Sequence, residues 1–140
     1  MYDKCCKCAG NILPGQPVFQ LAIGKYFPPA ITPTMPVHLG NWHKDHVNES
    51  VFRPQGQPYH CAICNDEIAG TEQVLYGVIG KQPEWCWIRA ESRGYVMQLV
   101  ACKKCWGTEQ IKQLLDEATV GETRRENLQY PRRGGGQHGR

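Results

Sequence analysis

Eight cysteines are the residues of this sequence that could most clearly do chemistry. Six of them form three Cys-x-x-Cys pairs, namely Cys5/Cys8, Cys61/Cys64 and Cys102/Cys105. A gap of two residues lets both thiolates of a tight turn converge on one tetrahedral zinc ion. Disulfides are typical of short secreted chains, and a thioredoxin-like redox site would use a single such pair. The three pairs therefore favour structural zinc, with disulfides and redox chemistry as the alternatives.

A histidine pair supplies the donors that the cysteine pairs lack. Two tetrahedral sites need about eight protein ligands, and three cysteine pairs provide too few. His43 and His46 have the same spacing as the cysteine pairs. His38 is a rival for one of these two positions, whereas His60 directly precedes Cys61 and could share its ion only under strain.

An internal repeat indicates which pairs belong together. A shift of the chain by 56 positions aligns residues 5–25 with residues 61–81 without a gap, and seven of the 21 aligned residues are identical. Composition alone would give about one or two identities. The second pairs also correspond, because 34 residues separate Cys8 from His43 and 37 separate Cys64 from Cys102. The repeat predicts two zinc ions, one held by Cys5, Cys8, His43 and His46 and the other by Cys61, Cys64, Cys102 and Cys105.

A strand pattern follows the first cysteine pair of each half, at residues 18–23 and 74–79. The Gly-Lys pairs that come next, 24–25 and 80–81, are expected to form hairpin turns. Residues 26–36 contain four prolines, which cannot donate ladder hydrogen bonds, and are predicted to form an extended loop.

The second half also predicts a further hairpin and the clearest helix. The hairpin comprises residues 85–89 and 95–100 and leads directly into Cys102. The helix follows Cys105, and we expect it to stop at Gly121. Its apolar stripe recurs at i, i+3, i+4 and i+7 and consists of Ile111, Leu114, Leu115 and Ala118.

The order of knuckle, β-hairpin and helix resembles the treble-clef zinc finger. The motif CxxCxxxI that opens each half, followed by a hairpin, is shared with LIM-type and PARP-type fingers. This resemblance implies a small, metal-stabilised α+β fold with two tandem treble-clef-like modules. The modules would span residues 1–53 and 61–120, joined by a linker at 54–60 and followed by a flexible basic Gly/Arg tail at 121–140. Four protein ligands leave no open position on zinc, so both ions are expected to be structural.

Charge is concentrated at the C-terminal end of the sequence. Residues 121–140 carry a net charge of +3, which equals that of the whole chain, so residues 1–120 are neutral overall. Basic glycine-rich tails resemble arginine-glycine segments that hold nucleic acid. We therefore expect a non-enzymatic, intracellular (cytoplasmic) protein that binds DNA or RNA as part of a larger assembly and has no membrane partner. The candidate nucleic-acid contacts are Lys103, Lys104, Arg124, Arg125, Arg132 and Arg133.

Two other functions remain open at this stage. Trp85 and Trp87 share one face of a predicted strand and either cover the small core or form the contact surface of a protein-interaction adaptor or inhibitor. A minor alternative is an HNH-like nuclease, because residues 45–47 and 61–65 faintly resemble that pattern. In this sequence no serine-histidine-aspartate, phosphate-loop or paired-carboxylate arrangement stands out, which disfavours an enzyme.

Overall fold

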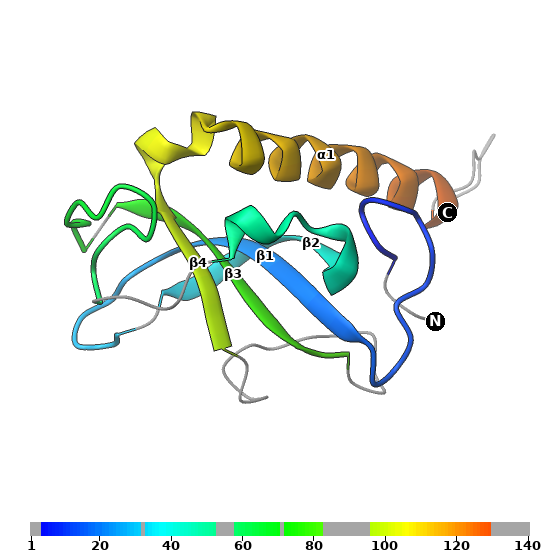
Figure 1. The fold of residues 1–140 in the computed structure, drawn as a ribbon, viewed down its shortest axis with the longest axis horizontal. Coiled ribbons are helices and arrows are strands. Elements are labelled where there is room, and N and C mark those ends of the chain that lie inside the picture. The colour runs from blue at the N-terminus through cyan, green and yellow to red at the C-terminus, as the bar shows by residue number, and fades with distance from the viewer. Residues whose placement is uncertain (1–3, 32, 53–57, 71, 83–95, 130–140) are drawn as a thin grey trace.

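The computed structural model describes residues 4–31, 33–52, 58–70, 72–82 and 96–129. Within these residues, four strands form one sheet, and one long helix lies across it (Figure 1). The strands are β1 (Pro17–Lys25), β2 (Thr34–His43), β3 (Gln73–Lys81) and β4 (Val96–Cys102). The helices are η1 (Lys44–His46), η2 (Glu49–Val51), η4 (Lys103–Gly107) and α1 (Glu109–Gln129).

The two halves of the chain share this sheet. Its strand order is β2-β1-β3-β4, and every neighbouring pair is antiparallel. At the centre, Leu21 of β1 lies opposite Gly77 of β3. These two residues are 56 positions apart, so they are equivalent in the repeat. The strands that join the two halves, β1 and β3, are therefore themselves equivalent and pair symmetrically around this central position.

The hairpins of the two halves have the same register. Val18 lies opposite His43, and its counterpart Val74 lies opposite Cys102. Each inner strand also has a register shift at the same place, directly after Leu21 in β1 and directly after Gly77 in β3. The second ligand pair of each half therefore begins at the same point, the last residue of the outer strand.

The Gly-Lys turns and the end of the predicted loop differ from the structure, and one further prediction is not tested by it. The strands continue through Lys25 and Lys81, so the predicted hairpin turns at Gly-Lys are wrong; the β1–β3 ladder, which local patterning does not encode, extends both strands. Residues 34–36 belong to β2 and not to a loop. Pro36 is accommodated because β2 is an edge strand. The predicted strand at residues 85–89 lies outside the described residues.

The core lies on the faces of the two inner strands. Residues 18–22 and 74–78 are buried at every position, so both faces of the sheet are covered there. The ring of Phe19 packs edge-on against Trp42, with 5.9 Å between ring centroids, and lies against Gly77. A Cβ at residue 77 would be 2.4 Å from that ring, so glycine makes room for the aromatic side chain.

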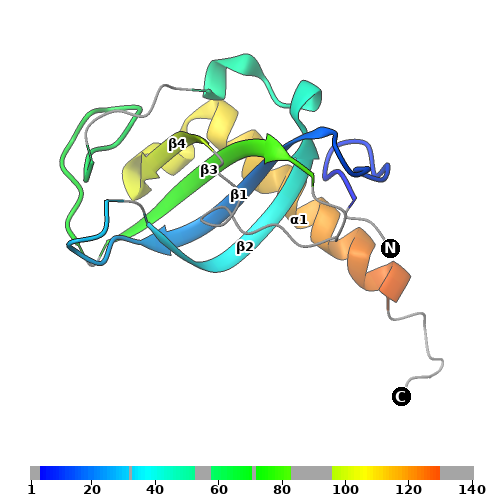
Figure 2. The same ribbon diagram turned by 90° about the horizontal axis from the view of Figure 1, so that it is seen from below.

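Helix α1 runs diagonally across one face of the sheet, from β4 to β2 (Figure 2). Its predicted apolar stripe is confirmed, because Ile111, Leu114 and Ala118 are buried and Leu115 packs against the core. The predicted stop at Gly121 is wrong, since the helix continues to Gln129 through residues that were predicted to belong to the tail. None of the described helices is both long and apolar enough to cross a membrane.

Candidate metal centres

Two groups of cysteine and histidine side chains in the described part of the chain could each hold a metal ion. Site 1 consists of Cys5, Cys8, His43 and His46, and site 2 consists of Cys61, Cys64, Cys102 and Cys105. In each group the four candidate ligand atoms all lie within 4.8 Å of one another. The structure thus brings together the same two sets of four that the repeat predicted.

Site 2 has the dimensions of a tetrahedral sulfur site. The Sγ atoms of Cys61 and Cys105 are 3.8 Å apart, those of Cys64 and Cys102 are 3.6 Å apart, and those of Cys102 and Cys105 are 3.7 Å apart. A regular tetrahedron with metal–sulfur bonds of about 2.3 Å has edges of about 3.8 Å. The four sulfurs therefore surround a space of the size that one such ion needs.

The backbone of each knuckle is arranged to stabilise a thiolate. In site 2, the N–H groups of Ile63 and Cys102 donate to Sγ of Cys61, at 3.3 Å and 3.4 Å. In site 1, the N–H groups of Lys7 and His43 donate to Sγ of Cys5, both at 3.4 Å. The matched donors come from positions that correspond in the repeat, so the same local fold prepares both sites.

The turn itself explains these donors. The N–H of Cys5 bonds the carbonyl of Gly10, and the N–H of Ala9 bonds the carbonyl of Cys5. The equivalent bonds in site 2 involve Cys61, Asp66 and Asn65. Ala9 and Asn65 both adopt a positive φ of 64°, which closes the turn and aims the N–H groups inward.

The thiols of site 2 differ sharply in acidity. Burial disfavours ionisation of Cys61, but the N–H groups of Cys102, Cys64 and Ile63 outweigh it and lower the pKa of this thiol to about 7. Burial, followed by the neighbouring Cys64 and Cys61 side chains, raises the pKa of Cys102 to about 11, and the pKa of Cys105 is also raised. The thiolate of Cys61 thus forms more readily than those of Cys102 and Cys105, and cation binding must displace the protons of these two thiols.

Site 1 combines two sulfurs with two imidazole nitrogens. The Nδ1 atoms of His46 and His43 each lie 3.5 Å from a sulfur, those of Cys5 and Cys8 respectively. A tetrahedral ion with sulfur and nitrogen ligands would separate such atoms by about 3.6 Å. The ring Nε2 of His43 donates to the carbonyl oxygen of Asn11 at 3.0 Å, so in the neutral ring the Nδ1 lone pair is the one directed at the site.

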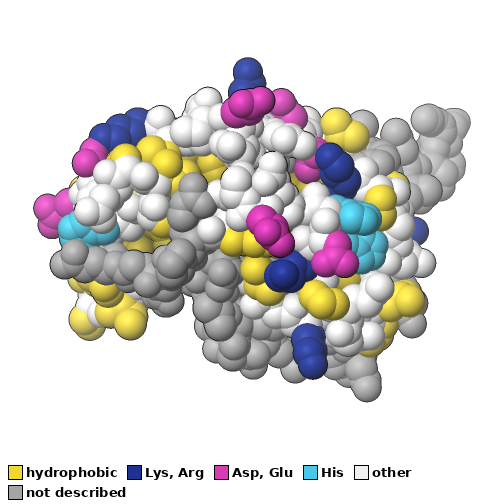
Figure 3. Space-filling view, viewed as in Figure 1, with side chains coloured by type: hydrophobic (Ala, Val, Ile, Leu, Met, Phe, Trp, Pro, Cys, Tyr) yellow, Lys and Arg dark blue, Asp and Glu magenta, His cyan; other side chains and the backbone are white. Residues whose placement is uncertain are grey.

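Exposure distinguishes the two sites. Cys61, Cys102 and Cys105 are buried and Cys64 is partly buried, whereas Cys8 and His46 of site 1 are exposed. Histidine side chains reach the molecular surface, as the space-filling view shows (Figure 3). A cavity of about 260 Å³ opens beside site 1, lined by Gln16, Pro17, His43, Lys44, Asp45 and His46.

The rival histidines do not join either site. Nε2 of His38 lies 3.0 Å from Oδ1 of Asn41, and Nδ1 of His60 donates to the carbonyl oxygen of Pro58 at 2.9 Å. Cys6, between the site 1 ligands, is buried at 2% exposure. Of the histidines that the sequence left open, His43 and His46 are therefore the two that the fold places beside Cys5 and Cys8.

The predicted contact residues have varied positions. Lys104 forms an ion pair with Asp66, which raises the pKa of this lysine and lowers that of Asp66, and the ammonium of Lys103 lies 5.9 Å from the centre of the Trp106 ring. Arg124 and Arg125 lie on α1. The remaining candidates lie outside the described residues and are Trp85, Trp87, Arg132 and Arg133.

Comparison with protein-family models, with curated proteins and with solved structures finds no match to this chain.

Two groups near site 1 had no signal in the sequence. The carbonyl of Asn11 accepts a hydrogen bond from the ring of His43, and the carboxylate of Glu117 accepts one from the ring of Trp42. Gly121 carried a usable signal, because it continues the spacing of Ile111, Leu114 and Ala118 on the apolar stripe.

Proposed function

We propose that both sites hold zinc and that the two ions are structural. The sulfur–sulfur and sulfur–nitrogen separations support this proposal, because they match the edges of tetrahedra built with zinc bond lengths. Thiolates and imidazoles are the ligands that zinc prefers, and a site with four of them leaves no position for water or substrate. Zinc bound there would join a knuckle to the end of an outer strand and stabilise the fold.

Each half is proposed to be a treble-clef-like module. In both halves a knuckle with the first ligand pair precedes a strand, and the second ligand pair spans the end of the outer strand and a short 3-10 helix, η1 or η4. In the second half a long helix follows, whereas the first half continues into η2. The two modules then share one helix, α1, over one sheet.

The proposed function of this scaffold is non-enzymatic binding of nucleic acid through its basic C-terminal segment. The observation that carries this proposal is the segregation of charge: residues 121–140 hold a net +3, while the rest of the chain is neutral. On the face drawn in Figure 3, Lys and Arg side chains lie scattered among acidic ones. Two body lysines, Lys7 and Lys104, already pair with carboxylates.

A matched pair of double variants tests this proposal. Arg132→Ala with Arg133→Ala removes two charges from the tail, and Lys81→Ala with Lys112→Ala removes two exposed charges from the body. We expect the arginine variant to weaken binding to a mixed-sequence oligonucleotide about tenfold and to reduce the salt slope by about two. Fluorescence anisotropy over a salt series measures both. Equal effects of the two variants, or binding insensitive to salt, would contradict the proposal.

A protein-interaction adaptor is the second candidate, favoured by a different observation. Phe27, Ile31 and Val37 are large apolar side chains within one stretch of eleven residues, and they are 57%, 58% and 49% exposed. An adaptor would keep its protein partner after deletion of residues 130–140 and lose it after Phe27→Ser with Ile31→Ser. Affinity capture with these two variants separates the candidates, since nucleic-acid binding would respond in the opposite way.

A further inference from the structure

Helix α1 connects the two metal sites. It begins at Glu109, shortly after the site 2 ligand Cys105, and the hydroxyl of Thr108 donates to the carbonyl oxygen of Cys105 at 3.0 Å. Twelve residues later, at Gly121, the helix lies against the knuckle of site 1. One rigid element therefore contacts the surroundings of both ions.

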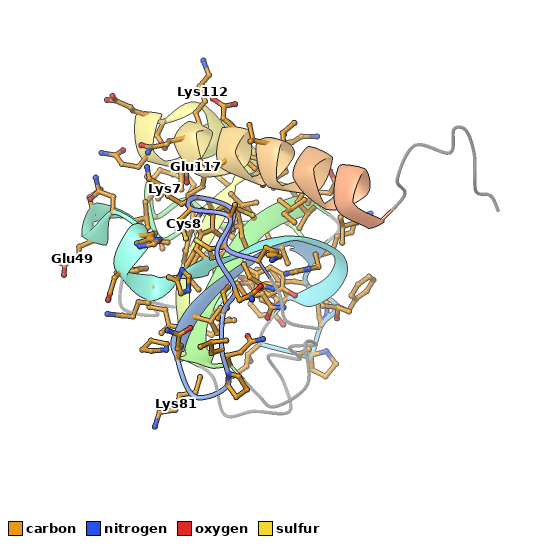
Figure 4. The ribbon with its side chains drawn as sticks, turned by 90° about the vertical axis from the view of Figure 1, so that its right-hand side faces the viewer. Lys7, Cys8, Glu49, Lys81, Lys112 and Glu117 are labelled. Atoms are coloured by element: carbon orange, nitrogen blue, oxygen red, sulfur yellow. The ribbon has the colours of Figure 1, made fainter. Side chains whose placement is uncertain are left out.

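The first contact with site 1 is a polar junction at Glu117. One carboxylate oxygen accepts from Nε1 of Trp42 at 2.9 Å, and the other pairs with Nζ of Lys7 at 3.1 Å. Lys7 stands between the ligands Cys5 and Cys8, and Trp42 directly precedes the ligand His43. Figure 4 shows Lys7 beside Glu117, with Cys8 on the same loop below α1.

The second contact is a close approach at Cys6. A Cβ on Gly121 would lie 2.8 Å from Sγ of Cys6, and a Cβ on Gly40 of β2 would lie 2.5 Å from the same atom. The Cys6 side chain thus fills the space between a glycine of the helix and a glycine of the strand. A shift of the knuckle toward either element would therefore press this side chain against its backbone.

Ion binding and helix docking use the same short turn. Residues 5–8 carry two ligands of site 1 and, between them, the two side chains on which α1 rests. An ion that fixes the turn and joins it to His43 also fixes Cys6, Lys7 and Trp42. Because coupling between two binding events is reciprocal, a docked helix must likewise favour the ion.

We propose that site 1 is a metal-responsive latch: zinc in site 1 holds α1 against the body at Glu117 and Gly121, and loss of that ion releases the helix from Glu117 to Gln129. The released part includes Arg124 and Arg125 and leads into the basic tail. This inference rests on the proposed function, because it makes site 1 the control of where the nucleic-acid-binding segment sits. Site 2 acts as the permanent anchor of the other end of the helix.

Hydrogen exchange measured by mass spectrometry tests the latch directly. His46→Ala removes an exposed ligand of site 1, and Asp45→Ala is the matched control because Asp45 is exposed on the same short helix but lies outside the ligand set. We expect amides of residues 118–129 to exchange about tenfold faster in His46→Ala than in the control, with residues 109–116 unchanged. Equal protection of residues 118–129 in the two variants would overturn the inference.

The reverse experiment keeps all ligands in place. Gly121→Leu forces the helix away from Cys6, and Val120→Leu adds a carbon at the neighbouring exposed position as the control. We expect about tenfold weaker zinc binding at site 1 in Gly121→Leu, with site 2 as the unchanged internal reference, in competition with a chromogenic chelator. An unchanged site 1 affinity would overturn the latch.

Neither hydrogen exchange nor zinc affinity is measured with nucleic acid present, so a failure of the proposed nucleic-acid binding is distinguishable from a failure of the latch. A wild-type protein that binds fewer than two ions contradicts the proposed metal sites. A protein that binds two ions, yet whose helix protection is independent of site 1, contradicts the latch alone.

Discussion

The two halves of this protein have one backbone design but finish their metal sites differently. The knuckle hydrogen bonds, the strand register and the position of the register shift correspond residue by residue. At the second ligand pair, however, His43 and His46 of site 1 occupy the places of Cys102 and Cys105 of site 2. The histidine pair of site 1 is partly or fully exposed, whereas the corresponding cysteine pair of site 2 is buried.

This difference indicates different metal retention on the same scaffold. Two thiolates and two neutral imidazoles around a divalent ion give a neutral site, whereas four thiolates leave a charge of about −2. A chelator can reach the exposed ligands Cys8 and His46 one at a time, but in site 2 most sulfurs are covered by protein. We therefore expect site 2 to maintain the fold and site 1 to exchange its ion.

The largest effect is expected from a matched pair of ligand substitutions, Cys64→Ser in site 2 and Cys8→Ser in site 1. A structural zinc ion contributes about 10–16 kcal/mol of apparent free energy, which is comparable to the whole stability of a typical domain of about 5–15 kcal/mol. Cys64→Ser should therefore abolish the cooperative thermal transition. Cys8→Ser should keep a cooperative transition at lower temperature, measured by circular dichroism.

The proposed difference between the two sites would be contradicted if these two variants unfold alike. Loss of all cooperative unfolding in Cys8→Ser would mean that both ions hold the shared sheet equally. A normal transition in Cys64→Ser would mean that site 2 contributes little, in spite of its burial.

The next effect concerns the rate at which each ion leaves. With excess chelator, we expect two phases of zinc release from the wild-type protein, the first about tenfold faster than the second, followed by absorbance of the chelator complex. The fast phase belongs to site 1 because its ligands are exposed. His43→Ala should bind one ion and show the slow phase alone; a fast phase in that variant would reverse the assignment.

One substitution makes the comparison sharper. His46→Cys gives site 1 the ligand that site 2 has at the corresponding position, 59 residues further along the chain. We expect its fast phase to slow toward that of site 2, because thiolate replaces imidazole while the exposure stays. If the rate does not change, exposure and not ligand chemistry controls release.

Features that leave a pattern in the sequence, by spacing or by repetition, could be predicted, whereas contacts between distant elements could not. The ligands could be predicted because their spacing recurs in both halves, but the repeat left open whether His38 replaces His43 or His46, and the fold answers this by placing His38 beside Asn41. The helix stripe was equally visible. The pairing of β1 with β3 could not be predicted, because two strand patterns carry no signal for which neighbour each will take.

The end of α1 shows how tertiary contacts override local signals. Gly121 disfavours helix by its backbone freedom, and a local interpretation ends the helix there. In the fold this glycine is needed inside the helix because it lets Cys6 approach. The interactions of Glu117 could not be predicted from the sequence either. Its partners Lys7 and Trp42 lie far away in sequence, and they meet it only when the knuckle, β2 and the helix pack together.

The smallest expected effect concerns charges beside the sites. At corresponding positions, η1 has Lys44 and Asp45, whereas η4 has two lysines, Lys103 and Lys104. Lys104 directly precedes the candidate ligand Cys105 and pairs with Asp66, and Asp66 most and then the Cys64 side chain raise the pKa of this lysine. Its charge would partly offset the negative charge of a four-thiolate site. A site 1 with two thiolates and two neutral imidazoles around zinc would be neutral and would need no such partner.

Removal of this charge should therefore affect one site and not the other. Lys103→Ala with Lys104→Ala should weaken zinc binding at site 2 by about twofold at low salt and less at high salt, because exposed charges are screened. Lys44→Ala is the matched change and should leave site 1 unaffected. Chelator competition at two ionic strengths measures both. A loss at site 1 as large as that at site 2 would show that the lysines act through general surface charge and not through the excess thiolate charge of site 2.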